Sequence, residues 1–344
     1  MNKYKNMNYD KIVRKIRHLF VSRLYKKRYY FYLYNSYRKT LLAKQLNICN
    51  QGGKKYYISA KPNYGAGIGH QLANWISGYY YSKFFGIEFA HYPFSNDKWD
   101  EFLGFYKFFE SVEELDNQKF KIVRLPYFIE ANKDDVEKIR EIINTYPAKS
   151  NVLFMLEQDQ FYKSQIGVID ELKYMYKTTC ENNKRRSIIN NKKLSISIHV
   201  RRGDIAVDNN SAKHMANRWS ANDYYCKVLD KVLSITKKMD IPTEICLFSQ
   251  GKQKDFKEFE KYDIRYCLDV DAITSFYSMS QSKILITSKS SFSYNPALFS
   301  LGIKIVPEDF WHDYPKEEEW IIANDDGVFE QNRLEKLLIN HKIS

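Results

Sequence analysis

Residues 194–204 read Leu-Ser-Ile-Ser-Ile-His-Val-Arg-Arg-Gly-Asp, and this stretch decides the fold class. From Leu194 to Val200 apolar residues alternate with small or polar ones, which is typical of a buried β-strand. Two arginines, a glycine and Asp204 follow directly. Because ligands of open α/β sheets bind at the carboxyl ends of the strands, the stretch predicts both a sheet and a binding site at its end.

On both sides of this strand, short apolar runs alternate with helical segments, as in parallel sheets covered by helices. We expect further strands at 56–60, 87–91, 121–125, 152–156, 244–248, 264–268, 283–287 and 303–306, the last of which closes the sheet. We expect helices at 71–85, 134–143, 220–239, 272–281 and 291–301. Ser220, followed by Asp223, is the expected cap of the third helix. The pattern predicts an α/β fold made of two doubly wound blocks.

A polar stretch at 181–193 is rich in Asn, Lys and Arg and is typical of a linker. We therefore expect four parts: a basic segment at 1–48, one α/β domain at 49–192, a second at 193–312, and a terminal helix at 313–344 that packs back on the body. The five cysteines are widely spaced and form no CxxC pair, which disfavours a disulfide framework or a zinc site. No apolar run is long enough to span a membrane.

The excess positive charge lies at one end of the chain. The whole chain has a net charge of +13, and residues 1–48 carry 8 Lys and 5 Arg against Asp10 alone, which is +12. The apolar residues of this segment recur at helical spacing: Ile12, Ile16, Leu19, Phe20 and Leu24. This pattern predicts a basic amphipathic helix, and a tyrosine-rich stretch follows it.

We expect residues 1–48 to hold the protein on the anionic inner face of the cell membrane, in the cytoplasm, since each Lys or Arg near such a surface contributes roughly 1 kcal/mol. Two alternatives remain: a helix docked on the body, and an arm that binds nucleic acid. The near-neutral remainder of the chain disfavours the second, so no nucleic-acid partner is expected.

Three stretches carry candidate site residues. Arg201 and Arg202 follow the strand of His199, and paired guanidinium groups match phosphate oxygens, so they predict a diphosphate site; a solvated charged turn is the alternative. At 287–293 a strand passes into a helix through small hydroxyls, and Ser290 and Ser291 are placed to bind a phosphate at the helix N-terminus or simply to cap it. The glycine-rich turn at 65–71 fits neither a phosphate loop nor a dinucleotide fingerprint, and we expect it to shape a cleft.

These pieces, in this order, resemble the bacterial α-1,2-fucosyltransferases and, more distantly, the α-1,6- and protein O-fucosyltransferases. The resemblance rests on 67–71 (Gly-Ile-Gly-His-Gln), on 199–204 (His-Val-Arg-Arg-Gly-Asp), and on a late segment with Met279, Ser280, Lys283 and 290–293 (Ser-Ser-Phe-Ser). The chain departs from the family at His70, at 249–251 (Ser-Gln-Gly), and at Tyr294 and Asn295.

The resemblance implies a GT-B fold, with two Rossmann-like domains facing a cleft, and an inverting transferase that takes a GDP-sugar and needs no metal or other cofactor. Arg201 would be catalytic, stabilising the charge that grows on the β-phosphate, with Asp204 as a candidate base. The residues expected to bind the donor are His199, Arg201, Arg202, Ser290, Ser291 and Phe292. The residues expected on the acceptor side of the cleft are Gly67, Gly69, His70 and Gln71.

We therefore expect a transferase that moves fucose from GDP-fucose to a glycan acceptor in the synthesis of a surface polysaccharide. Another nucleotide sugar, or a non-catalytic protein that binds lipid or nucleic acid through its basic arm, is the alternative. Asp208, His214 and Glu88 are further candidate bases, and Arg218 and Trp219 either line the donor pocket or belong to the core. The pair Asp269 and Asp271 resembles the DxD metal sites of other transferases, although short acidic pairs are common by chance.

Overall fold

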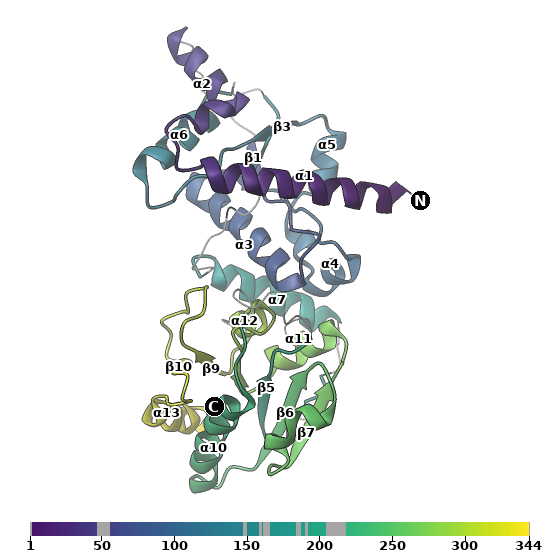
Figure 1. Ribbon diagram of the computed structural model, residues 1–344, viewed down its shortest axis with the longest axis vertical. Coiled ribbons are helices and arrows are strands. Elements are labelled where there is room, and N and C mark those ends of the chain that lie inside the picture. Colours follow the sequence, from purple (N-terminus) through teal and green to yellow (C-terminus); the bar gives the residue numbers. More distant parts are fainter. Residues whose placement is uncertain are drawn as a thin grey trace. The chain divides into compact units, whose positions relative to one another are not determined.

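The computed structural model describes residues 2–46, 56–146, 150–157, 160, 166–183, 187–189, 192–203 and 218–343. The chain divides into two compact units, Met1–Val168 and Ile169–Ser344. Each unit is built on one parallel sheet (Figure 1). The expected α/β class with two parallel-sheet units is confirmed.

The first unit has a four-stranded sheet in the order β2-β1-β4-β3. Its strands are β1 (Tyr56–Ser59), β2 (Glu88–Phe89), β3 (Lys121–Arg124) and β4 (Val152–Met155). Its helices are α1 (Asn2–Leu24), α2 (Asn35–Gln45), α3 (Ile68–Phe85), α4 (Asp97–Leu103), α5 (Val112–Asn117) and α6 (Lys133–Asn144), with short 3-10 helices η1 (Phe31–Leu33) and η2 (Phe105–Phe108). All four strands lie where the sequence predicts them, although β2 is shorter.

Part of the basic segment belongs to the core of this unit. Four aromatic residues that follow α1 pack with Ile58, Phe154 and Ile142 in one apolar cluster: Tyr30, Phe31, Tyr34 and Tyr37. Tyr30 is completely buried, and its ring meets that of Tyr34 at 5.3 Å. The aromatic residues at 30–37 therefore pack on the body of this unit.

Three residues of the apolar stripe of helix α1 face away from that core, whereas Leu24 at its end packs against it. The predicted helix is confirmed, but Ile12, Ile16 and Leu19 have exposed fractions of 59%, 63% and 52%. The half-buried side of the helix carries Arg14 and Arg17 instead. An amphipathic helix that docks on a body normally buries its apolar face, so this orientation leaves an apolar strip without cover in the described part of the chain.

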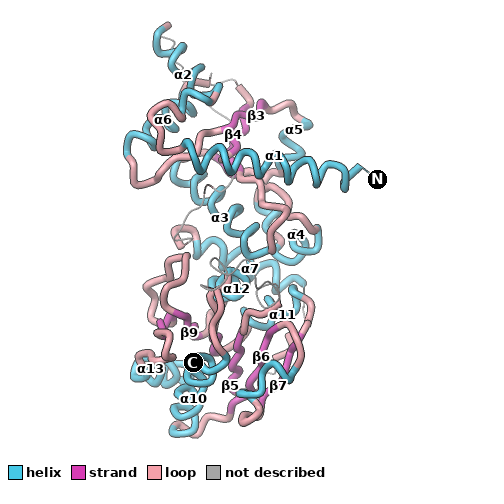
Figure 2. Tube along the Cα trace, viewed as in Figure 1, coloured by secondary structure: helices cyan, strands magenta, loops and turns pink. Residues whose placement is uncertain are grey.

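The second unit has a six-stranded sheet in the order β10-β9-β8-β5-β6-β7 (Figure 2, magenta). Its strands are β5 (Leu194–His199), β6 (Thr243–Ser249), β7 (Ile264–Leu268), β8 (Ile284–Ile286), β9 (Ile303–Pro307) and β10 (Trp320–Ala323). Its helices are α7 (Ile169–Asn183), α10 (Asn222–Lys238), α11 (Ala272–Ser280), α12 (Ser291–Phe299) and α13 (Gln331–Ile343), with the 3-10 helix η3 (Gln253–Phe259).

Two expectations about the ends of elements in this unit are wrong. The sheet does not close at β9, because Trp320–Ala323 adds a parallel strand beside it before α13 begins. This short apolar run between acidic residues holds four residues, too few to show a period. Helix α10 is confirmed, but its N-cap is Ala221 rather than Ser220, and Ala221 makes no side-chain cap.

The first helix of this unit precedes the expected linker. The ring of Tyr176 on α7 stacks on Phe299 of α12 at 4.8 Å, and its hydroxyl lies 2.9 Å from that of Ser280. Within the stretch 181–193, the backbone of Ile188 bonds to Arg265 and to Ser278. Because these contacts are made within the second unit, the division falls before α7 rather than at residue 193.

None of the helices in the part of the chain that the structure describes is long and apolar enough to cross a membrane. Three of the cysteines are described as free and buried thiols: Cys226, Cys246 and Cys267.

Candidate functional site

The candidate site lies where the second sheet changes winding direction. The chain runs from β5 outward through β6 and β7, then returns to the other side of β5 to form β8. Connections from the neighbours β5 and β8 therefore leave in opposite directions, and such a switch point opens a crevice at the carboxyl ends of the strands. The stretches 199–203 and 287–293 both begin at this point.

Apolar and polar side chains alternate along β5, and this alternation determines which side chains lie on each face of the sheet at the switch point. Ile196, Ile198 and Val200 point into the core that α10 covers. The opposite face carries small hydroxyls, and Ser197 contacts Ser282 at 2.6 Å. His199 continues this polar face at the end of the strand.

His199 is a buried, neutral imidazole. Its Nδ1 lies 2.8 Å from the hydroxyl of Ser288, which follows β8, and its ring lies 5.5 Å from that of Phe292. Burial, then the positive charges of Arg201 and Arg202, lowers the pKa of His199 to about 3. The hydrogen bond to Ser288 fixes the ring orientation, so His199 presents a fixed dipole rather than a charge at this point.

Arg201 is the half-buried cation of the site. Its Nη1 donates a hydrogen bond to the hydroxyl of Ser290 at 3.1 Å, which joins the end of β5 to the start of α12. Ser290 is the N-cap of α12 and accepts from the backbone N–H of Phe292. Ser291 is the first residue of the helix. Arg201, Ser290, Ser291 and Phe292 are thus brought together, at a helix end that attracts anions.

Arg202, by contrast, is directed into the protein. Its guanidinium donates to the backbone oxygen of Ser220 at 3.2 Å and to Oδ1 of Asn222 at 2.6 Å, and it lies 3.9 Å from the ring centre of Trp219. The side chain is 8% exposed, and burial lowers its pKa. These contacts anchor the start of α10, so the two neighbouring arginines have different partners.

Gly203 has a positive φ of 76°, and a Cβ on it would clash with Oε1 of Gln250. The loop after β6 therefore lies directly against the turn that follows the arginines. Asp204, like Asp208 and His214, lies outside the described residues. Its role as a base stays a prediction.

Other charged groups of the second unit have partners within that unit. Lys289 pairs with Asp325 at 3.0 Å. The carboxylates of Glu308, Asp309 and Asp325 lie within 4.8 Å of one another, an arrangement common among exposed acidic groups. Asp271 accepts a hydrogen bond from the N–H of Thr274 and caps α11, which explains one half of the DxD pair without a metal.

The glycine-rich turn of the first unit is built as a helix start. Gly67 is the N-cap of α3, and Gly69 and His70 lie in the first turn of this helix. Gln71 is buried and exchanges hydrogen bonds with Ser95 through both amide atoms. These four residues hold the turn in place, whereas the residues just before them, 63–65, line a pocket.

The sequence reasoning missed two serines that complete the site. Ser288 contacts both His199 and the hydroxyl of Ser293, which also bonds to the N–H of Ser288 at 3.2 Å. The signal was present in the run of small hydroxyls at 287–293, but only the strand order brings Ser288 beside His199. The pair fixes the imidazole and the first turn of α12 in one network.

No protein-family model matches the chain, and no curated protein matches it. Solved structures of similar fold include the apo form of POFUT1, with a TM-score of 0.46 and 10% identity over 73% of this chain and 96% of that one. They also include a mutant of Arabidopsis thaliana FUT1 in complex with GDP, with a TM-score of 0.38 and 14% identity over 79% of this chain and 74% of that one. A third is E. coli ADP-heptose lps heptosyltransferase II, with a TM-score of 0.41 and 9% identity over 84% of this chain and 99% of that one. At these identities the likeness concerns the fold alone.

Proposed function

We propose that this protein is an inverting glycosyltransferase that transfers fucose from GDP-fucose to a glycan acceptor of a surface polysaccharide. The observation that carries the proposal is the position of Arg201, whose guanidinium is held by Ser290 at the N-terminus of α12. A guanidinium and the positive end of a helix dipole both favour an anion, which supports a diphosphate site at this position. The choice of guanosine as the nucleoside and of fucose as the sugar rests on the resemblance of the sequence motifs to fucosyltransferases.

In the reaction, the acceptor hydroxyl forms a bond to the anomeric carbon of the sugar while the bond from that carbon to the diphosphate breaks. The electron pair of the broken bond goes to the β-phosphate of GDP, and Arg201 stabilises the added charge. The acceptor proton goes to a base, for which Asp204 remains the candidate. In this proposal the fixed cation takes the place of a metal.

His199 has a positioning role in this proposal. A charged imidazole next to Arg201 would repel it, and burial removes that charge. The neutral ring keeps Arg201 available to the diphosphate, while Ser288 holds the ring. We assign Arg202 to the support of the turn, because its described partners are Ser220 and Asn222.

Thermal unfolding with and without GDP tests the proposal. A saturating nucleotide, at about 100 times its dissociation constant, adds about 2.7 kcal/mol and raises the Tm by about 5 °C or more. Arg201→Ala should abolish this shift. Arg265→Ala removes an arginine and one hydrogen bond elsewhere in the same unit and should keep it. A larger Tm shift with ADP or UDP than with GDP would show that the donor carries another nucleotide. No Tm shift with any nucleotide would refute the proposed transferase function.

We also propose that α1 attaches the protein to an anionic membrane surface. The support is the exposed strip of Ile12, Ile16 and Leu19, on a segment with a net charge of +12. Apolar side chains that insert at the lipid boundary, flanked by lysines and arginines, are the features of an interfacial helix.

Sedimentation with vesicles that contain anionic lipid tests this attachment. The double variant Ile16→Asp and Leu19→Asp should lose binding, while its stability stays unchanged because both side chains are exposed. Leu301→Asp changes an exposed apolar residue of the second unit and should bind as the wild type does. Equal binding of all three proteins would argue against attachment through α1.

A further inference from the structure

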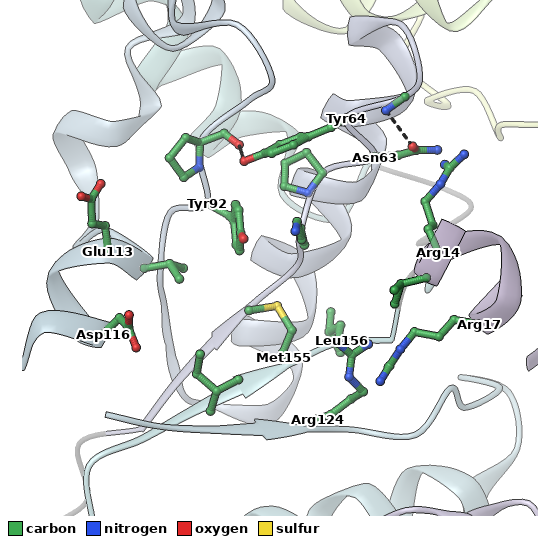
Figure 3. A pocket seen from close by; sticks show the side chains of 17 residues that line it. Arg14, Arg17, Asn63, Tyr64, Tyr92, Glu113, Asp116, Arg124, Met155 and Leu156 are labelled. Carbon is green, nitrogen blue, oxygen red and sulfur yellow. Dashed lines mark hydrogen bonds between the residues drawn. The ribbon is translucent and has the colours of Figure 1, made fainter. Parts of the chain in front are cut away.

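The first unit holds a pocket of about 570 Å³, and Gly65, the first residue of the glycine-rich turn, lines it, whereas Gly67, Gly69, His70 and Gln71 do not. It lies at the carboxyl ends of the strands: Lys61 to Gly65 follow β1, Tyr92 follows β2, Arg124 ends β3, and Met155 ends β4. Helix α1 contributes Arg14 and Arg17 from its half-buried side (Figure 3). The volume suits a ligand of one or two sugar rings.

One end of the pocket is cationic. Arg14, Arg17 and Arg124 lie together on one side of it (Figure 3). Glu157, which is buried, pairs with Arg124 at 3.1 Å and with Arg17 at 3.5 Å, and so offsets only part of this charge. Within the described residues, no carboxylate pairs with Arg14. An anion bound here would be held by guanidinium groups from two separate elements.

The rest of the pocket carries two tyrosine rings, with the ammonium of Lys61 near both of them, and two carboxylates. Tyr64 and Tyr92 meet edge to face at 6.3 Å, and the hydroxyl of Tyr64 is fixed by the backbone oxygen of Pro93. Glu113 and Asp116 of α5 lie on the side opposite the arginines (Figure 3). Aromatic rings pack on the apolar faces of sugars, and carboxylates accept hydrogen bonds from their hydroxyls.

We propose that this pocket binds a phosphorylated carbohydrate, with the phosphate at Arg14, Arg17 and Arg124 and the sugar between the tyrosines and the carboxylates of α5. This inference rests on the proposed function and narrows it, since it gives the acceptor a phosphate group. It also gives α1 two roles: its inner side binds the acceptor phosphate, and its outer side contacts the membrane. An acceptor glycan attached to lipid through a phosphate would satisfy both sides of this helix at once.

Arg14 offers the sharpest test, because it has no carboxylate partner to leave behind. Loss of Arg17 or Arg124 would leave Glu157 underpaired and affect the fold. Lys15 is the matched control, since it is the next residue of the same helix, carries the same charge and is exposed. Both variants, Arg14→Gln and Lys15→Gln, lower the charge of the basic segment equally.

The experiment is calorimetric titration of the full-length protein with glucose 1-phosphate, inorganic phosphate and methyl glucoside, with and without saturating GDP. We expect glucose 1-phosphate to bind most tightly, and Arg14→Gln to weaken it about tenfold, the effect of one charge-assisted hydrogen bond. Lys15→Gln should keep the wild-type affinity.

Equal affinity in the wild type and in Arg14→Gln, or no saturable binding of glucose 1-phosphate, would overturn the proposal. Inorganic phosphate that binds as tightly as glucose 1-phosphate would overturn its carbohydrate part, and methyl glucoside that does so would overturn its phosphate part. A chain that binds glucose 1-phosphate through Arg14 but gives no shift with any nucleotide refutes the proposed function and leaves this site. The reverse result refutes this site alone.

Discussion

The carboxyl ends of the two sheets carry different kinds of polar side chain. In the second unit, small hydroxyls and a neutral imidazole surround one half-buried arginine, and the neighbouring cations Arg202 and Lys289 are engaged with protein groups. In the first unit, three arginines and a lysine line one pocket together with two tyrosines. In the functions that we propose, anion binding depends mainly on Arg201 in the second unit and on several cations in the first.

This difference teaches that the number of basic residues near a site is a poor guide to its chemistry. Arg201 and Arg202 are adjacent in the sequence, yet only Arg201 reaches Ser290 at the start of α12. Arg14 and Arg124 are far apart in the sequence, yet they line one pocket. The following changes test what individual polar and charged side chains of the two units do.

The largest expected effect is on turnover in Arg201→Lys. Lysine keeps the charge but loses the paired N–H groups, and loss of one preorganised donor at a developing oxyanion costs about 100-fold in rate. Hydrolysis of the nucleotide sugar at saturating donor measures this. In Arg202→Lys the loss should instead follow the fraction of unfolded protein, and a folded Arg202→Lys protein with the same 100-fold defect would contradict the assigned roles.

The next effect is on stability in Glu157→Gln. The buried carboxylate offsets Arg17 and Arg124 and accepts a hydrogen bond from Tyr34, so its neutralisation should cost about 2 kcal/mol, reduced because both arginines are partly exposed. Urea unfolding measures this. Glu141→Gln removes the carboxylate of an exposed pair with Lys44 and should cost less than about 1 kcal/mol. Equal losses of stability in the two variants would show that the ion pairs of Glu157 with Arg17 and Arg124 are as well solvated as the exposed pair.

A smaller effect is on pH dependence. The pKa of His199 is about 3 in the folded chain and about 6.5 when unfolded, so between these values only the unfolded state binds the proton. Stability should fall as pH drops below 6.5, by about 1 kcal/mol per pH unit from this group. Melting curves between pH 7.5 and 4.5 should show a shallower slope in His199→Gln, and an unchanged slope would mean that His199 is charged when folded.

The smallest effect distinguishes a helix cap from a metal ligand at Asp271. Asn caps as well as Asp, so Asp271→Asn should leave both stability and turnover unchanged, whereas Asp271→Ala should cost about 1 kcal/mol of stability only. Melting and donor hydrolysis with and without added Mn²⁺ measure both. A loss of Mn²⁺-dependent turnover in Asp271→Asn would restore the metal interpretation.

The sequence predicts most of the secondary structure because the strands are short buried runs and the helices have clear periods. Trp320–Ala323 escaped since four apolar residues in an acidic tail show no period. Ser220 was wrongly predicted to cap α10, because the capping pattern in the sequence does not show that its carbonyl accepts a hydrogen bond from Arg202. These errors come from tertiary contacts that local patterns do not contain.

The candidate site was partly predictable for the same reason. The strand end at His199 and the hydroxyl run at 287–293 are local patterns, and the strand order brings them together. The pocket of the first unit was not predictable, because Arg14 and Arg17 lie on the side of α1 opposite its apolar stripe. Amphipathic reasoning assigns that side to solvent, whereas it faces the body through Glu157.

Calorimetric titration of GDP into the wild-type protein, Arg201→Ala and Arg14→Gln tests the central claim most directly. The nucleotide site at β5 and α12 predicts equal affinity for the wild type and Arg14→Gln, and an affinity at least about tenfold weaker for Arg201→Ala. GDP that binds Arg201→Ala as tightly as the wild type, or that loses affinity in Arg14→Gln instead, would contradict it.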